Sequence, residues 1–433
     1  MKLALIRRQF AATGGAELYL QRLMNALASA GHDLHLFAET WEQAPHGVAI
    51  HHVSAVGSRA TRPLRFAVAV ETELAKERFD CVFSLERTLR QDVYRAGDGV
   101  HRVWLKRRRQ FAHWWRRPFL GLGAFHRNIL RLEAQTFDTR NTRHIIANSE
   151  MVRREIVENF RFPAERIHVV RNGVDVTRFQ SGQRAETRAR FGIKDDEFLL
   201  LFVGSGWERK GLAFVLRAMR RLEAGGWLSQ FWSNLRDDLV WWRELEGLAR
   251  RWSEWEAAER LAIRAFLKTV AGEQPARVLE ARAAWRTFAA RVKLLVVGKG
   301  RKPLRCPANV IFASSMVDVQ NAYAAADLFI FLPIYEPSAN VVCEALAAGV
   351  PVVTSAQNGA SEIIEPKVNG IIIDDPSDTR RVVEATAHWW LRRFYSPPVR
   401  AAQLSLDRNV SETLAVLEMA ALDKLGQPGS RLQ

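Results

Sequence analysis

The strongest constraint on the fold is a pattern that occurs once in each half of the chain. Residues 3–6 and 198–203 are uncharged apolar runs, and each is followed by a loop with two glycines and then by a helical pattern. Runs of this length are typical of strands buried in a parallel sheet. A strand, a glycine turn and a helix together begin a βα unit. The repetition therefore predicts two α/β domains.

The length and the later apolar runs support this division. A chain of 433 residues is too long for one ordinary core and suits two domains. We expect an α/β protein with two Rossmann-like, doubly wound domains facing a cleft, over residues 1–175 and 176–399, with a polar linker at about 174–194. Ligands of such sheets bind at the carboxyl ends of the strands. Further strands are predicted at 34–37, 81–83, 145–147, 167–171, 294–297, 310–312, 328–332 and 352–353.

Residues 224–290 interrupt the second unit and contain no strand-like run. They hold half of the chain's 14 tryptophans, among many arginines and glutamates. We expect a helical insertion within the second domain. Two explanations of the tryptophans stay open: they form the small core of the insertion, or they contact a partner or a membrane.

Composition limits where the chain works. Its three cysteines are far apart and form no C-x-x-C pair, which favours a reducing compartment. The first apolar stretch is too short for a signal peptide, and no run is long enough to span a bilayer. We therefore expect a cytoplasmic protein. The net charge of +16 fits nucleic acid, an anionic membrane surface or an anionic small substrate, and composition alone does not decide among them.

The clearest chemical constellation follows the predicted strand at 328–332. Ser338 suits the N-cap position of the next helix. The first amides of that helix, near Asn340 and Val341, would face an anion with the helix dipole in the favourable direction. Glu344 is four residues after Asn340 and so shares its helical face. A carboxylate there could accept hydrogen bonds from a ribose diol, which predicts nucleotide binding.

A second group of residues suits a diphosphate. Arg209 and Lys210 lie in the glycine loop that opens at Gly204, just beyond a predicted strand. Arginine offers a bidentate fork to phosphate, and lysine offers a point charge. In the first half, Gly14 and Gly15 would let the backbone approach the same phosphate closely. No two aspartates are spaced i, i+2, so we expect no metal ion and no other cofactor: positive side chains and helix dipoles would stabilise the leaving group instead.

The loop at 95–101 follows the predicted strand at 81–83, and two glycines flank its aspartate. Such a loop suits the lining of a cleft. Asp98 or His101 could bind a transferred group or position an acceptor hydroxyl. A purely structural role for each stays open.

Several elements, taken in order, resemble the motifs of the retaining family 4 glycosyltransferases, which have the GT-B fold. The insertion and the long basic stretch after Asp98 depart from that pattern. The matching elements are Gly14-Gly15-Ala16-Glu17, Asn148-Ser149-Glu150, Asn172-Gly173-Val174-Asp175, Gly204 to Gly211, Glu336 to Glu344 with the following residues to Val353, and the later loops Asn358-Gly359 to Glu362 and Asn369-Gly370.

The resemblance implies transfer of a sugar from a nucleotide diphosphate donor with retention of anomeric configuration, by front-face attack assisted by the leaving phosphate. It implies an acceptor in the first domain, a donor in the second with Glu336 at the donor site, and C-terminal helices at about 400–424 that pack back on the first domain. Similarity to lipopolysaccharide core enzymes implies a hexosyl- or heptosyltransferase acting on a lipid-linked acceptor, such as lipopolysaccharide core, at the inner face of the cytoplasmic membrane.

Residues 99–132 contain no Asp or Glu and interleave basic with aromatic side chains. Trp104, Phe111 and Trp115 are spaced to share one helical face, and Pro118 would end that helix. The stretch at 102–117 fits an anionic membrane surface, a phosphorylated lipid-linked acceptor or a solvated basic face. No nucleic-acid-binding motif accompanies the charge, so we expect no nucleic-acid partner.

Two other functions stay open. A related GT-B enzyme could hydrolyse or epimerise the nucleotide sugar instead of transferring it. A non-catalytic protein that binds membrane or nucleic acid would show no saturable binding of a nucleotide sugar.

Overall fold

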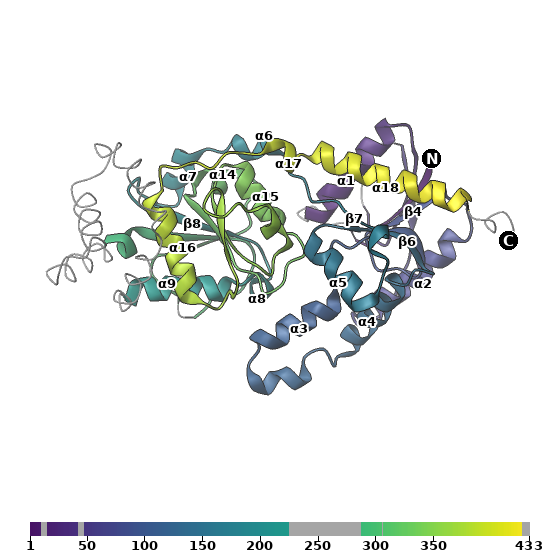
Figure 1. Cartoon of the computed structure of the whole chain (residues 1–433), viewed down its shortest axis with the longest axis horizontal. Helices are drawn as coiled ribbons and strands as arrows, with labels where there is room; N and C mark the ends of the chain where they lie inside the picture. The colour runs from purple at the N-terminus through teal and green to yellow at the C-terminus, as the bar shows by residue number, and fades with distance from the viewer. Residues whose placement is uncertain (10–14, 42–46, 225–286, 305, 427–433) are drawn as a thin grey trace.

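Figure 1 shows the computed structural model of the chain, which describes residues 1–9, 15–41, 47–224, 287–304 and 306–426. Two parallel sheets with helices packed against them form two domains that lie side by side. This confirms the predicted α/β class with two doubly wound domains. The predicted helical insertion falls almost entirely on residues 225–286, outside the described residues.

The first domain is built on a seven-stranded parallel sheet in the order β3-β2-β1-β4-β5-β6-β7. The sequence did not reveal β3 and β5 because both carry histidine or charged residues where an apolar run is expected. The strands are β1 (Lys2–Ile6), β2 (Asp33–Ala38), β3 (Val48–His52), β4 (Cys81–Ser84), β5 (Gln91–Arg95), β6 (Thr142–Ala147) and β7 (Ile167–Val169).

Helices cover both faces of this sheet. Successive side chains of a strand point to opposite faces, so Leu3 and Leu5 pack in one apolar cluster and Ala4 and Ile6 pack in another. The first cluster includes residues of α1 and α18, and the second includes residues of α2. The helices of this domain are α1 (Gly15–Ser29), α2 (Arg62–Leu74), α3 (His101–Phe111), η1 (Trp114–Phe119), α4 (Ala124–Thr136), α5 (Glu150–Phe160), η2 (Ala164–Arg166) and α18 (Leu406–Gly426).

The second domain has a six-stranded parallel sheet in the order β10-β9-β8-β11-β12-β13. Its central strand β8 reads FLLLFV and is buried along most of its length, as a strand covered on both faces must be. The strands are β8 (Phe198–Val203), β9 (Val292–Val297), β10 (Val310–Ala313), β11 (Leu328–Phe331), β12 (Val352–Ser355) and β13 (Gly370–Ile373). The helices are α6 (Val176–Gln180), α7 (Arg184–Arg190), α8 (Trp207–Lys210), α9 (Leu212–Ala224), α14 (Val319–Ala325), α15 (Asn340–Ala347), η4 (Gly359–Ile363), α16 (Thr379–Leu391) and α17 (Ala401–Leu404).

The prediction of a polar linker at 174–194 is wrong, because α6 and α7 occupy that stretch and pack against α14. The polar sequence conceals a buried guanidinium. Arg188 is only 3% exposed and donates hydrogen bonds to the carbonyl oxygens of Ala325, Lys194 and Glu197. A buried charge is tolerated when it is paired and hydrogen bonded, and Asp327 Oδ2 lies 3.3 Å from Arg188 Nη1. This arginine therefore joins α7 to the residue that precedes β11.

The chain crosses between the domains at residues 173–174 and again at 404–406, and these two segments lie side by side. Gly173 lies against the backbone of Ser405 and Leu406, so closely that a side chain there would overlap both. The Val174 amide donates to the Leu404 carbonyl oxygen at 2.8 Å. Beyond this crossing α18 returns to the first domain, where it packs beside β4, β5 and β6.

The basic aromatic stretch forms an arm that projects from the first domain (Figure 1). The predicted common face of Trp104, Phe111 and Trp115 is wrong, because α3 ends at Phe111 and Trp115 belongs to the separate turn η1. Pro118 lies inside η1 and does not end α3. Trp104 and Phe111 pack against the second domain's core instead. Among the described helices, none combines the length and the apolar character that a membrane span requires.

Candidate functional site

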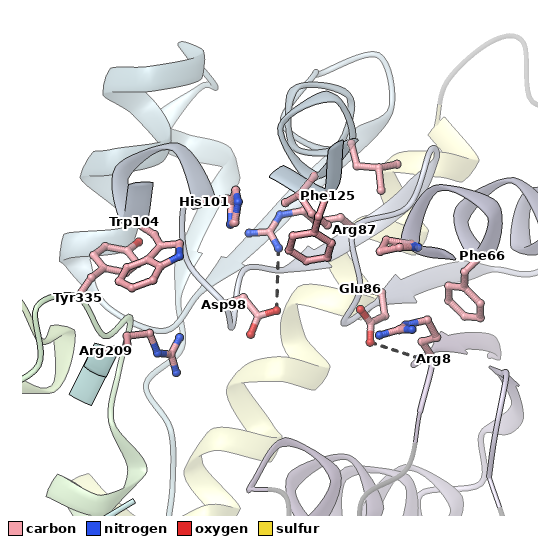
Figure 2. A pocket seen from close by; sticks show the side chains of 13 residues that line it. Arg8, Phe66, Glu86, Arg87, Asp98, His101, Trp104, Phe125, Arg209 and Tyr335 are labelled. Carbon is pink, nitrogen blue, oxygen red and sulfur yellow. Dashed lines mark hydrogen bonds and ion pairs between the residues drawn. The ribbon is translucent and has the colours of Figure 1, made fainter. Parts of the chain in front are cut away.

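The two sheets each reverse their strand order at one pair of strands, β1 with β4 and β8 with β11. In doubly wound sheets a crevice opens at the carboxyl ends of this pair, and ligands bind there. Arg8 and Arg87 follow β1 and β4, while Arg209 and Tyr335 follow β8 and β11. All four side chains line one cavity of about 330 Å³ between the domains (Figure 2).

The cavity combines apolar walls with charged groups, as small-ligand pockets do. Only Arg209 and Tyr335 come from the second domain. The first domain supplies Arg8, Pro63, Phe66, Glu86, Arg87, Asp98, His101, Trp104, Phe125, Ile129 and Leu132.

Tyr335 ties the two domains together at the edge of this cavity. Its hydroxyl donates to Glu155 Oε2 at 2.7 Å and accepts from the Val100 amide at 2.8 Å, and both partners belong to the first domain. Gly99, with φ of +66°, passes so close that a Cβ atom there would overlap the Tyr335 hydroxyl. Tyr335 is 1% exposed, so its hydroxyl needs these partners, which it has only while the domains are in contact.

Two further hydrogen-bonded groups join the domains beside Tyr335. Ser149 Oγ donates to the Pro337 carbonyl oxygen at 2.7 Å. Asn172 Nδ2 donates to Asn340 Oδ1 at 2.6 Å, and Asn172 Oδ1 accepts from Arg95 Nη2 at 2.8 Å. The Asn340 side chain therefore faces the first domain from the amino end of α15.

The structure places Asp98 and His101 in the cavity wall (Figure 2). Asp98 is largely exposed, and its Oδ2 lies 3.9 Å from Arg87 Nη1. The buried Glu133 carboxylate accepts from the amides of His101 and Arg102. An acceptor at the first amides of a helix fixes where that helix starts, so Glu133 holds His101 at the cavity.

His101 is electrically neutral at physiological pH. Burial, together with the positive charge of Arg87, lowers its pKa to about 4. Its Nε2 lies 3.0 Å from Nδ1 of His126, and the two rings stack. A neutral imidazole can exchange hydrogen bonds with a sugar hydroxyl without adding charge to the site.

Arg209 and Glu336 form an ion pair at the carboxyl ends of β8 and β11, with 3.2 Å between Nη2 and Oε2. The Arg209 carbonyl oxygen also accepts from the Ile334 amide at 3.0 Å. The loops that follow the two strands therefore hold one another. The guanidinium stays 40% exposed toward the cavity, which leaves donors available for a ligand.

Lys210 lies deeper in the same loop. Burial lowers the pKa of its ammonium, while the carboxylate of Glu336 acts in the opposite direction. Among the described residues, no carboxylate lies within ion-pair distance of this ammonium, and the centroid of the Phe331 ring lies 5.8 Å from Lys210 Nζ. A half-buried cation without a counter-ion favours an anionic ligand.

Glu344 lies one turn into α15. Its Oε2 accepts from the Tyr323 hydroxyl at 2.7 Å, and burial raises its pKa. The carbonyl oxygen of Val341, three residues before Glu344, lies 3.3 Å from the same Tyr323 hydroxyl. Tyr323 therefore orients the Glu344 carboxylate.

The predicted capping role of Ser338 is wrong. The N-cap position is Ala339, whose side chain makes no capping bond. Asn358 Oδ1 instead accepts from the amides of Ala339 and Ala360, at 3.2 and 3.1 Å. The cap comes from a residue distant in sequence, which local pattern could not show.

The structure describes two of the three glycines that we predicted beside the phosphate. Gly204 has φ of +148°, and a side chain there would overlap the Lys210 side chain, so only glycine leaves room for that lysine. Gly15 is the first residue of α1, and Gly14 lies outside the described residues.

Several residues of the cavity were not predicted from the sequence, among them Arg8, Arg87 and Tyr335. Tyr335 directly precedes Glu336, but nothing in its own sequence neighbourhood indicates contact with the other domain. Arg8 and Arg87 lie at the carboxyl ends of the reversal strands β1 and β4. Once the strand order is known, the switch-point rule identifies both.

Comparison with known protein families matches each domain separately. Residues 13–178 match the model described as Glycosyltransferase Family 4. Residues 271–390 match the model described as Glycosyl transferases group 1. Both matched regions contribute residues to the contact between the domains.

Relatives and solved structures cover nearly all of the chain. Lipopolysaccharide glucosyltransferase WaaG of Escherichia coli is 23% identical over 407 residues, which are 92% of this chain and 91% of that enzyme. A WaaG crystal structure superposes with a TM-score of 0.65 at 21% identity, covering 98% of this chain and all of that one. Anabaena Alr3699/HepE, solved in complex with UDP-glucose, gives a TM-score of 0.58 at 14% identity, covering 96% and 100%.

Other relatives match over shorter stretches. D-inositol 3-phosphate glycosyltransferase 1 of Catenulispora acidiphila is 27% identical over 243 residues. That match covers 56% of this chain and 48% of the enzyme.

The hydrogen bond between Tyr335 and Glu155 predicts how stability depends on pH. Burial raises the pKa of Glu155 to about 7, although the hydrogen bond from Tyr335 and the charge of Arg107 both act to lower it. The folded chain therefore holds this proton more tightly than the unfolded chain, and its stability should fall as pH rises from about 4.5 to 7. A pKa difference of one corresponds to about 1.4 kcal/mol. Glu155→Gln keeps an acceptor for the Tyr335 hydroxyl but does not titrate, so it should remove the part of the pH-dependent loss of stability that Glu155 causes.

Urea unfolding at pH 5 and pH 8 measures the effect. Glu155→Gln should gain stability relative to the wild type at pH 8 and lose that advantage at pH 5. Glu158→Gln, an exposed change on the same helix, serves as the control: it keeps Glu155 and should keep most of the wild-type pH dependence, reduced only by the small effect of Glu158 on the Glu155 pKa. Parallel pH profiles for the wild type and Glu155→Gln would contradict the assignment.

Proposed function

We propose that this chain is a GT-B glycosyltransferase that transfers glucose from UDP-glucose to a lipid-linked saccharide such as lipopolysaccharide core, with retention of anomeric configuration. The main support is the half-buried ammonium of Lys210, which lies beside Arg209 at the reversal point of the second sheet and has no carboxylate within ion-pair distance among the described residues. The likeness to lipopolysaccharide glucosyltransferase WaaG and to Alr3699/HepE, which was solved with UDP-glucose, supports these choices of donor and acceptor.

The second domain supplies three kinds of contact to the donor. Arg209 and Lys210 offer charged donors to the diphosphate, and the amino end of α15 offers backbone amides with a favourable dipole. Glu344, oriented by Tyr323, accepts from the ribose hydroxyls. In this proposal these groups stabilise the charge on the leaving diphosphate, and no metal ion is required.

The first domain supplies the surface for the reacting sugars. The acceptor hydroxyl oxygen forms a bond to the anomeric carbon on the face from which UDP leaves. The bond from that carbon to the phosphate oxygen breaks, and the hydroxyl proton passes to the leaving phosphate. His101, neutral at physiological pH, and Asp98 hydrogen bond to sugar hydroxyls, while Phe66 and Phe125 provide apolar walls.

The projecting arm favours an acceptor held in a membrane. Its turn η1 exposes Trp114, Trp115 and Phe119 to 76%, 55% and 72%. Arg116 lies over the ring of Trp115 and Arg117 is exposed beside it. Exposed aromatic side chains next to basic ones suit the boundary between anionic headgroups and acyl chains. Part of the predicted 102–117 stretch serves another purpose, because Arg108 pairs with Glu208 of the second domain at 3.2 Å.

The phosphate contacts predict the effect of two substitutions on turnover. Arg209→Ala and Lys210→Met each remove a charge-assisted hydrogen bond, worth about 1.5–3 kcal/mol. Each should lower kcat/KM for UDP-glucose by that amount while the variants stay folded. Arg220→Ala, an exposed arginine on the adjoining α9, is the matched control. Wild-type kcat/KM in both folded variants would rule out the proposed donor site.

The exposed aromatic residues predict how the chain associates with membranes. A fully buried apolar side chain of this size contributes about 1.5–3 kcal/mol, so the triple change Trp114→Ala, Trp115→Ala and Phe119→Ala should strongly reduce co-sedimentation with anionic vesicles. Raised salt should weaken the wild-type binding that remains electrostatic. The control replaces two exposed leucines of α18, Leu422 and Leu425, by alanine. Equal vesicle binding by the wild type and the triple variant would contradict membrane docking through η1.

A further inference from the structure

A cluster of potential metal ligands lies on the α2 side of the first sheet, away from the cavity. His35 and His51 come from the neighbouring strands β2 and β3, and Glu77 comes from the turn between α2 and β4. One ligand atom from each lies within 4.8 Å of the other two. His35 Nδ1 is 2.8 Å from His51 Nε2 and 3.7 Å from Glu77 Oε2. Among the described residues, no other group of three such side chains converges in this way.

The outer contacts of these side chains leave the converging atoms facing one another, where His35 Nδ1 and His51 Nε2 share one hydrogen bond that a metal ion would replace. His35 Nε2 lies 3.4 Å from Asp33 Oδ1, on the side of the ring away from His51. A carboxylate on the outer nitrogen fixes the tautomer in which Nδ1 carries a lone pair, and this arrangement is typical of metal-binding histidines. The other oxygen of Glu77 pairs with Lys2. That ion pair holds the carboxylate beside His35 and leaves Oε2 free to bind.

The two imidazoles are held in place by packing. The His51 ring stacks on Phe37, with 4.4 Å between the centroids, and on His35 at 5.0 Å. The His35 side chain is 12% exposed and Glu77 is 39% exposed, so an ion could enter from the Glu77 side.

We propose that His35, His51 and Glu77 form a binding site for a divalent transition-metal ion, with Zn²⁺ as the best fit to two imidazoles and one carboxylate. Such a ligand set suits tetrahedral Zn²⁺ with a fourth position for water. Glu77 would rotate toward the imidazoles on binding. The ion would join the edge strand β3 to β2 and to the turn after α2.

The site is separate from the transfer chemistry. Lys2 and His35 lie toward the amino ends of β1 and β2, whereas the cavity lies at the carboxyl ends. The metal would therefore act on stability, and sugar transfer would proceed without it. This inference does not depend on the proposed donor or acceptor.

A second histidine pair in the same sheet provides an internal control. His144 Nδ1 lies 3.1 Å from His168 Nε2 on β6 and β7, and Asp423 lies 2.8 Å from His144 Nε2. With Asp423, this pair has the same arrangement as Asp33, His35 and His51, in which a carboxylate lies beside one of two facing imidazoles. It differs in that no third ligand from the described residues converges on the facing nitrogens. It should bind Zn²⁺ far more weakly.

The test is competition for Zn²⁺ between the full-length chain, freed of any histidine tag, and a chromophoric chelator at neutral pH. The wild type and His168→Gln should each take up one Zn²⁺ with the same affinity and gain thermal stability from it. Asp33→Asn should lose about 10–100-fold in affinity, and His51→Gln and Glu77→Gln should lose at least as much. Glu77 is exposed, so Glu77→Gln tests the site even if His51→Gln fails to fold.

Substitution with Co²⁺ provides an independent readout through its visible absorption, which should indicate tetrahedral coordination in the wild type and disappear in Glu77→Gln. The proposal is overturned if the wild type binds less than one equivalent of Zn²⁺, or if Glu77→Gln binds it as tightly as the wild type. Loss of binding in His168→Gln alone would assign the metal to the other pair and would equally overturn it.

Discussion

The arrangement of the site depends on a small set of hydrogen bonds that only the contact between the two domains can provide. The Tyr335 hydroxyl bonds to Glu155 and Val100, and Asn172 bonds to Asn340. Polar groups that are buried without partners cost free energy. The contact therefore sets the separation at which Arg209, from one sheet, faces Asp98 and His101, from the other.

Charge in the site follows from the same geometry. The first domain brings a neutral imidazole and the second brings two cations, of which Lys210 lacks a carboxylate partner among the described residues. The second domain can therefore bind an anionic leaving group, but it does not itself position an acceptor. The first domain offers apolar walls and hydrogen-bonding groups, and its cation Arg87 is already paired with Glu133. Transfer between two substrates would therefore require both domains.

Much of the fold could be predicted because buried parallel strands read as apolar runs, as β1 and β8 do. Strands with polar residues, such as β3 and β5, could not be predicted in this way. The helical segment around Arg188 resembled a linker because a polar sequence does not show that this arginine is buried. In the site, Arg209, Lys210 and Glu344 could be proposed because they follow strands within short motifs. Tyr335, Tyr323 and Glu133 could not, because their partners are distant in sequence and only the packed structure brings them together.

Transfer of a sugar across the cavity, from a donor on one domain to an acceptor on the other, can be followed with UDP-glucose labelled in the sugar. The chain is incubated with this donor, with and without lipopolysaccharide core acceptor, and the label is located. We expect label in the acceptor, in the anomeric configuration of the donor, and little release when the acceptor is omitted. Free labelled glucose produced at the same rate with or without acceptor would contradict this expectation and indicate hydrolysis.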